Sequence, residues 1–79
     1  MLRAFVLLNT EIGFEDTVLK NLLSIDEIKE AHPLLGEYDI ICEIKINSRL
    51  KDVIQKIRTL AKVSTISTMI VVKGSSKEQ

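Results

Sequence analysis

The chain has 79 residues and a formal net charge of zero, because 11 basic residues balance 11 acidic ones. This length predicts a single domain over residues 1–79, with an ordered core over about 2–73 and a polar tail over 74–79. The absence of a basic excess argues against direct binding of nucleic acid. The apolar run at the start is too short to span a membrane and lacks the cleavage pattern of a signal peptide, so we expect a cytoplasmic domain that does not associate with membranes.

The reactive residue types are scarce. Cys42 is the single cysteine and His32 the single histidine, so the sequence offers neither a disulfide nor a metal-binding cluster. We expect Cys42 to pack as a small hydrophobic residue and His32 to lie on the surface. A domain this short has a marginal core, so regular packing or oligomerisation is expected to stabilise it.

The first half of the chain predicts a strand, a helix and a second strand. In Leu2–Asn9 both sets of alternate residues are apolar, which indicates a strand buried on both sides. Phe14–Leu23 has helical spacing of apolar residues, with acidic residues in its first turn. Glu27–Leu34 alternates with a period of two, and Pro33 predicts an edge strand because proline cannot donate to a central ladder.

The second half predicts the same three elements in the same order. A short connection containing a glycine leads to a strand over Tyr38–Ile46, which suggests an antiparallel hairpin. Asn47 and Ser48 are candidates to cap a helix over Arg49–Ala61, whose apolar residues form one stripe. The last strand is expected from Val63 to about Lys73.

This order of elements predicts an α+β fold of the ferredoxin-like βαββαβ type. Right-handed crossovers place both helices on one face of a four-stranded antiparallel sheet. They also place the first and third strands in the centre and the second and fourth at the edges.

The sheet face without helices carries large apolar side chains from neighbouring strands, namely Phe5, Leu7, Ile41, Met69 and Val71. Single apolar residues on a surface are ordinary. Because these residues come from three adjacent strands, we favour the interpretation that a second copy of the chain covers them in a two-fold homodimer.

A glycine-containing turn is the first candidate for a binding site. Gly36 allows a ligand to approach the backbone, exposed turn amides can hold a carboxylate, and Asp39 can hold an ammonium group. Ser67 and Thr68, in the hydroxyl-rich last strand, are the second candidate. The spacing by itself favours the ordinary alternatives. These are a hairpin turn that contains a glycine for the first candidate and strand-forming residues for the second.

Catalytic motifs are missing from the sequence. It has no glycine-rich phosphate loop and no nucleophile elbow, and residues 9–13 contain no arginine for an acylphosphatase-like anion cradle. Phe5 alone offers an aromatic ring on the central strands, which argues against RNA stacking on the sheet. We therefore expect a protein that is not an enzyme and has no cofactor.

The chain resembles the stand-alone effector-binding (RAM) domain of the Lrp/AsnC transcriptional regulators. The opening strand AFVLLNT, the turn GEYDI, the helix segment IRTLAKV and the ending VSTISTMIVV carry the resemblance, which runs from Ala4 to Lys73. It implies dimers through facing sheets, assembly into octamer or decamer rings, and an amino-acid effector bound between dimers. It further implies a site lined by Gly36, Tyr38, Asp39, Ser67 and Thr68.

The usual helix-turn-helix is not in this sequence, so the resemblance does not imply direct control of an operator. It implies instead a sensing and oligomerisation module that modulates transcription through its assembly or through a full-length Lrp/AsnC paralogue. The alternative is a purely structural self-assembly domain without a ligand.

Overall fold

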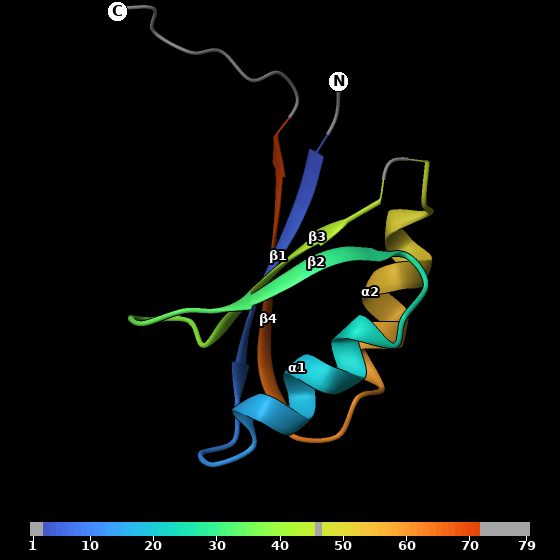
Figure 1. Ribbon diagram of the computed structural model, residues 1–79. Coiled ribbons are helices and arrows are strands. Elements are labelled where there is room, and N and C mark those ends of the chain that lie inside the picture. The colour runs from blue at the N-terminus through green and yellow to red at the C-terminus, as the bar shows by residue number, and fades with distance from the viewer. Residues whose placement is uncertain (1–2, 46, 72–79) are drawn as a thin grey trace, which may run out of the picture.

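The computed structural model describes residues 3–45 and 47–71, with the backbone only for Val71 (Figure 1). Its elements, in chain order, are β1 (Arg3–Thr10), α1 (Glu15–Leu23), β2 (Ile28–Pro33), β3 (Ile40–Ile44), α2 (Leu50–Arg58) and β4 (Val63–Val71). This order confirms the predicted ferredoxin-like α+β fold. The strand ends predicted at Leu2, Ile46 and Lys73, and the tail over 74–79, lie outside the described residues.

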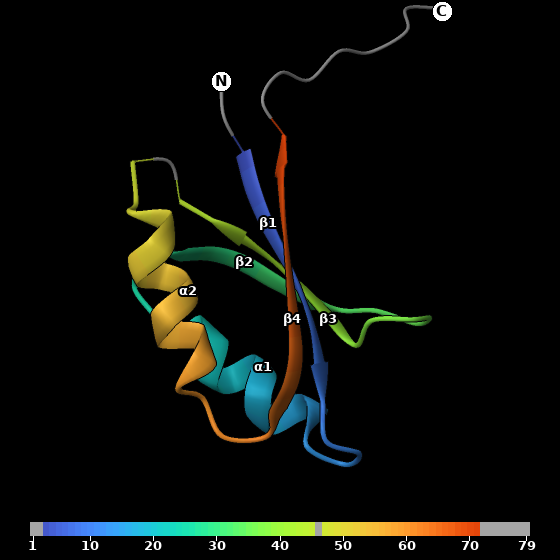
Figure 2. The same cartoon turned by 180° about the vertical axis from the view of Figure 1, so that it is seen from behind.

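One antiparallel sheet joins the four strands in the order β2-β3-β1-β4. The predicted placement is therefore correct, with the first and third strands in the centre. Pro33 lies on edge strand β2, opposite Ile40. Both helices lie on the same side of the sheet, which leaves the other side, here called the open face, without a helix (Figures 1 and 2).

The core lies between the sheet and the helices. Its apolar members are Val6, Leu8, Val18, Leu22, Ile28, Ile40, Cys42, Ile44, Val53 and Ile57. The central strands supply alternate residues and each helix supplies residues on one stripe, as their periodicity predicts. Each full burial of such a side chain contributes about 1.5–3 kcal/mol.

β2 departs from the predicted alternation. The register against β3 shifts between Ile28 and Glu30, so the strand contains a bulge there. The bulge places Ile28 and Ala31 on the core side together, a spacing of three that a regular strand cannot give. The strict period of two predicted for this segment is therefore wrong at its start.

The helices are shorter than predicted. Phe14 precedes α1 as its N-cap residue, and its carbonyl accepts the first helical hydrogen bond from Val18 at 2.9 Å. α2 ends at Arg58, where Thr59 turns out of the helix, so Ala61 is exposed. Leu23 is also 53% exposed, because it lies at the edge of the stripe that α1 buries.

The predicted caps of α2 are wrong. Arg49 is the N-cap residue and no side chain caps the helix. Asn47 adopts a left-handed φ of 73°, and the backbone N–H of Ser48 donates to the carbonyl of Lys45 at 3.3 Å. These two residues form the turn that precedes the helix.

Candidate ligand-binding site

The β2–β3 connection forms a closed turn around Gly36. The N–H of Leu34 donates to the carbonyl of Asp39 at 2.8 Å, which closes the turn at its base. Gly36 has a φ of +136°, a backbone conformation that other residues adopt only with strain. Apart from the glycine and its two chain neighbours, no heavy atom of the described residues lies within 4 Å of the position that a Cβ would take, so this side of the glycine is open to an approaching ligand.

Asp39 joins this turn to the end of β1. Its Oδ2 atom accepts the N–H of Thr10 at 2.8 Å, and the Thr10 hydroxyl lies 3.5 Å away. Its own N–H donates to the carbonyl of Leu8 at 2.9 Å and to the Asn9 side-chain oxygen at 3.2 Å. A carboxylate that accepts a backbone N–H at this distance has a structural role, whatever else it binds.

The hydrogen bonds continue on both sides of Asp39. The Asn9 amide donates to the Thr65 hydroxyl at 3.0 Å, which ties β1 to β4. On the other side, the Thr10 hydroxyl lies 3.3 Å from the Glu15 carboxylate, which also accepts the N–H of Gly13 at 2.9 Å. These hydrogen-bond partners were not predicted, although Asn9 and Thr10, two polar residues at the end of an apolar strand, are a usable signal in the sequence.

The five predicted site residues do not all meet within one chain. Gly36, Tyr38 and Asp39 share the turn, and Ser67 pairs with Leu7 on the open face. Thr68 pairs with the buried Val6 and faces the helix side, where it lines a hollow beside α2. A ligand bound by both Asp39 and Thr68 would therefore need groups from more than one chain.

The open face holds the predicted interface residues side by side. Phe5 pairs with Met69, and Leu7 pairs with Ile41. Met69 is 47% exposed and the other three are half-buried. The side chain of the fifth predicted residue, Val71, lies outside the described part of the chain. The four described side chains thus form a continuous apolar strip across three strands.

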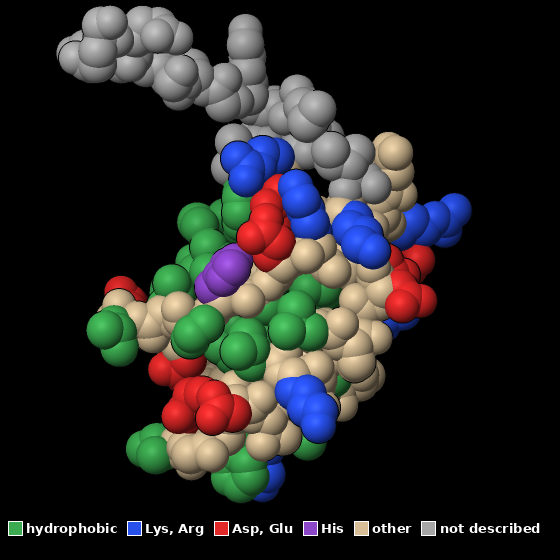
Figure 3. All heavy atoms as spheres, viewed as in Figure 1, with side chains coloured by type: hydrophobic (Ala, Val, Ile, Leu, Met, Phe, Trp, Pro, Cys, Tyr) green, Lys and Arg blue, Asp and Glu red, His purple; other side chains and the backbone are tan. Residues whose placement is uncertain are grey.

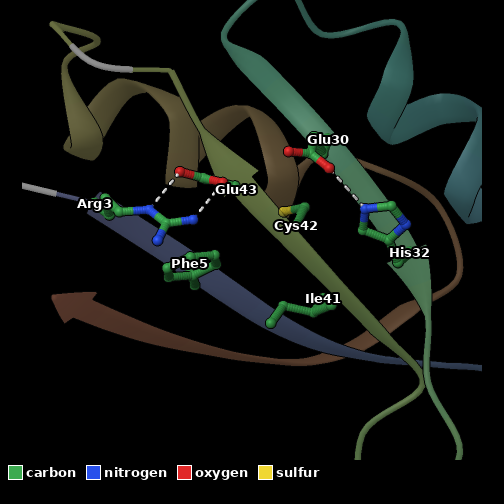
Figure 4. A pocket seen from close by; sticks show the side chains of 7 residues that line it. All are labelled: Arg3, Phe5, Glu30, His32, Ile41, Cys42 and Glu43. Atoms are coloured by element: carbon green, nitrogen blue, oxygen red, sulfur yellow. Dashed lines mark hydrogen bonds and ion pairs between the residues drawn. The ribbon is translucent and has the colours of Figure 1, made fainter. Parts of the chain in front are cut away.

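A hollow of about 190 Å³ lies at one end of this strip (Figure 4). Arg3 and Glu43 form an ion pair across it, with nitrogen–oxygen distances of 3.1 and 3.3 Å. Hydrogen bonding to Arg3 lowers the pKa of the Glu43 carboxyl, and the same bond raises the pKa of Arg3. The guanidinium also lies 5.0 Å from the Phe5 ring centroid, within cation–π range.

Two side chains of chemically reactive types, His32 and Cys42, line this hollow. His32 is exposed next to hydrophobic side chains (Figure 3) and its Nε2 lies 3.0 Å from Glu30. Burial raises the pKa of the Cys42 thiol to about 11, so the nucleophilic thiolate is scarce at neutral pH. Among residues 3–45 and 47–71, no three His, Cys, Asp or Glu side chains lie together as a metal site.

These features define a class of small α+β domain with an apolar sheet face and a turn fixed by an aspartate. The profile of the family described as Lrp/AsnC ligand binding domain matches residues 3–79. The chain belongs to this family.

Solved structures agree with that assignment. A hypothetical protein, PHS023 from Pyrococcus horikoshii, is 38% identical, with 94% of this chain and 93% of that one covered and a TM-score of 0.77. FFRP-DM1 is 39% identical over 91% of this chain and all of its own, also with a TM-score of 0.77.

A more distant structure shares the fold at 16% identity and a TM-score of 0.75. It is the transcriptional regulator NMB0573 of Neisseria meningitidis in complex with L-Met, matched over 96% of this chain and 53% of its own. No curated protein sequence matches the chain. None of the helices in the described segments is long and apolar enough to cross a membrane.

Proposed function

We propose that this domain binds a small amino-acid effector and responds through its assembly, without catalysing a reaction. The observation that carries the proposal is the match of residues 3–79 to a family of ligand-binding domains of transcriptional regulators. The L-Met complex of the fold relative from Neisseria meningitidis supports an amino acid as the ligand class.

The turn offers complementary groups for an α-amino acid. The backbone amides around Gly36 suit a carboxylate, because residues 34–37 of the turn are exposed. Asp39 uses Oδ2 for the backbone of Thr10, and its Oδ1 makes no hydrogen bond within the described residues, so Oδ1 is free to accept from an ammonium group. Tyr38 flanks both groups. Ser67, from the open face, and Thr68, from the helix side of β4, complete the site from neighbouring subunits.

The assembly in this proposal begins with a homodimer through the open face. The apolar strip of Phe5, Leu7, Ile41 and Met69 supplies the contact, and Val71 is the fifth residue proposed for this interface. Dimers then join into octamer or decamer rings, with the effector between them. The same surfaces allow mixed assembly with a full-length Lrp/AsnC paralogue, so that the cytoplasmic domain acts on transcription without binding DNA itself.

A second candidate function is self-assembly without a ligand. The bond between Asp39 and Thr10 favours it, because that bond gives the aspartate a role in the fold alone. The two candidate functions differ in whether Asp39 binds an amino acid in addition to stabilising the fold.

Thermal unfolding in the presence of each common amino acid separates the candidates. The sensing function predicts that at least one amino acid raises the melting temperature, since a ligand that binds only the native state stabilises it. Asp39→Asn should abolish that shift, whereas Glu37→Gln, a matched change of an exposed acid in the same turn, should preserve it. No shift with any amino acid would favour the structural candidate. An equal shift in both variants would show that the ligand binds without Asp39, which would contradict the proposed site.

A further inference from the structure

The outer edge of β4 is open to a further strand. β4 pairs with β1 on one side, and within residues 3–45 and 47–71 no strand pairs with its other side. Figure 2 shows β4 in front of β1, with α2 beside it. An unpaired edge presents a row of backbone donors and acceptors, which another extended chain can use.

A groove follows this edge between β4 and α2. One hollow, of about 580 Å³, is lined by Leu50, Lys51, Ile54, Gln55, Arg58 and Thr68. A second, of about 330 Å³, is lined by Arg58 together with residues 63–66. The two hollows share Arg58 and both lie along β4, so they adjoin at its edge and are here together called the groove.

Apolar side chains form the floor of the groove. Leu50, Ile54 and Ile66 are only partly buried against the core, although each faces it. Ile70, which pairs with Ala4 further along β4 and lies outside the two hollows, is 52% exposed. These side chains would bury further apolar surface if a strand were added beside β4.

The rim of the groove on α2 is basic. Lys51, Gln55 and Arg58 lie at positions four and seven residues apart, which places them on one side of the helix. Within the described residues neither Lys51 nor Arg58 forms an ion pair, in contrast to Lys56, whose Nζ lies 2.8 Å from Glu27. The rim therefore presents positive charge that no ion pair among residues 3–45 and 47–71 neutralises.

Charge argues against a second copy as the occupant. A two-fold pairing of β4 edges would bring Lys51 and Arg58 of both copies to the same interface, and like charges across an interface are unfavourable. We propose instead that the groove binds an extended acidic segment of a partner protein, added as a fifth strand beside β4. Its acidic side chains contact Lys51 and Arg58, and its apolar side chains contact Ile54 and Ile70.

A pair of fluorescent peptides tests this proposal. One repeats Glu-Val four times and the other repeats Lys-Val four times, and binding to the wild-type protein is measured by anisotropy. We expect the acidic peptide to bind at least tenfold more tightly. Charge reversal in Lys51→Glu and in Arg58→Glu should each weaken it about tenfold, because contact with a cation of the rim is lost. Lys20→Glu, a matched charge reversal at an exposed position of α1, should leave the affinity for the acidic peptide unchanged.

Backbone amide NMR shifts locate the contact, and circular dichroism confirms that each variant folds. Shifts along 63–71 on addition of the acidic peptide would support the proposal. Equal binding of both peptides, an equal loss in Lys20→Glu, or shifts confined to the turn over 34–39 would overturn it. An increase in solution mass caused by Lys51→Glu alone would also overturn it, since it would indicate a second copy in the groove.

Discussion

The carboxylate of Asp39 and the backbone N–H of Thr10 form a 2.8 Å hydrogen bond that ties the start of β3 to the end of β1. The side chain that the sequence assigned to ligand binding therefore also stabilises the fold. A ligand that uses Asp39 would meet a carboxylate already held in one orientation, which lowers the entropic cost of binding.

Removal of this carboxylate should destabilise the domain. Asp39→Ala leaves the partly buried N–H of Thr10 without its acceptor, so we expect a loss of about 1–3 kcal/mol in the free energy of unfolding. Urea denaturation at fixed protein concentration measures it. Asp39→Asn keeps an acceptor oxygen and should lose less, and Glu37→Ala should lose almost nothing. Equal stability of Asp39→Ala and wild type would contradict the structural role.

The Arg3–Glu43 ion pair should make stability depend on pH. The pKa of Glu43 is lowered by its hydrogen bond to Arg3. The contribution of the Glu43 carboxylate to the free energy of unfolding is therefore fully present above about pH 4.3, the usual pKa of a glutamate carboxyl. This contribution is lost as the pH falls through the lower pKa that Glu43 has in the folded state. Unfolding free energies of wild type and Glu43→Gln should differ at pH 7 and converge near pH 3.

Glu37→Gln is the control for that titration, because Glu37 is an exposed acid outside the ion pair. Its free energy of unfolding should follow the wild type at every pH. A difference between wild type and Glu43→Gln that grows towards pH 3 would show that the sign of the effect is wrong.

Two adjacent leucines in α1 test the placement of the core. Leu22 is fully buried and Leu23 is 53% exposed. Leu22→Ala should cost about 2–5 kcal/mol of unfolding free energy through lost burial and a residual cavity. Leu23→Ala should cost less than about 0.5 kcal/mol, as surface changes usually do. Thermal or urea unfolding compares them, and similar losses would contradict the assigned helix orientation.

Cys42 should be inert in the folded protein. Its thiol is buried and its pKa is raised to about 11. Because the thiolate is the reactive species, a colourless disulfide reagent that releases a chromophore should react slowly at pH 8 and rapidly in denaturant. Fast reaction of the native protein would mean that the core opens at β3 or that the thiol is not buried.

Hydrophobic periodicity was sufficient to predict the element order and the sheet topology. β1 and β3 alternate regularly, and Pro33 identified an edge strand. The bulge before Glu30 was not predictable, because it depends on pairing with a distant strand rather than on local pattern. Asn47 and Ser48 suit a cap by residue type, but the chain uses them in a turn, and residue preference alone does not distinguish the two roles.

The candidate site was harder to predict than the fold. Gly36 and Asp39 lie in one turn as expected, because residues only three positions apart in the sequence stay close in space. Ser67 and Thr68 face opposite sides of the sheet, as any two consecutive strand residues must. The hydrogen bond between Asn9 and Thr65 was not predictable, because it depends on the register of β1 against β4. That register brings residues far apart in the chain into contact.

The most direct test of the central claim is the solution mass by light scattering, with and without the common amino acids. We predict a mass several times the 8.9 kDa of one chain, and a change in that mass with at least one amino acid. A monomer at 8.9 kDa under all conditions would contradict both the interface and the sensing function. A large assembly that no amino acid alters would contradict sensing through assembly.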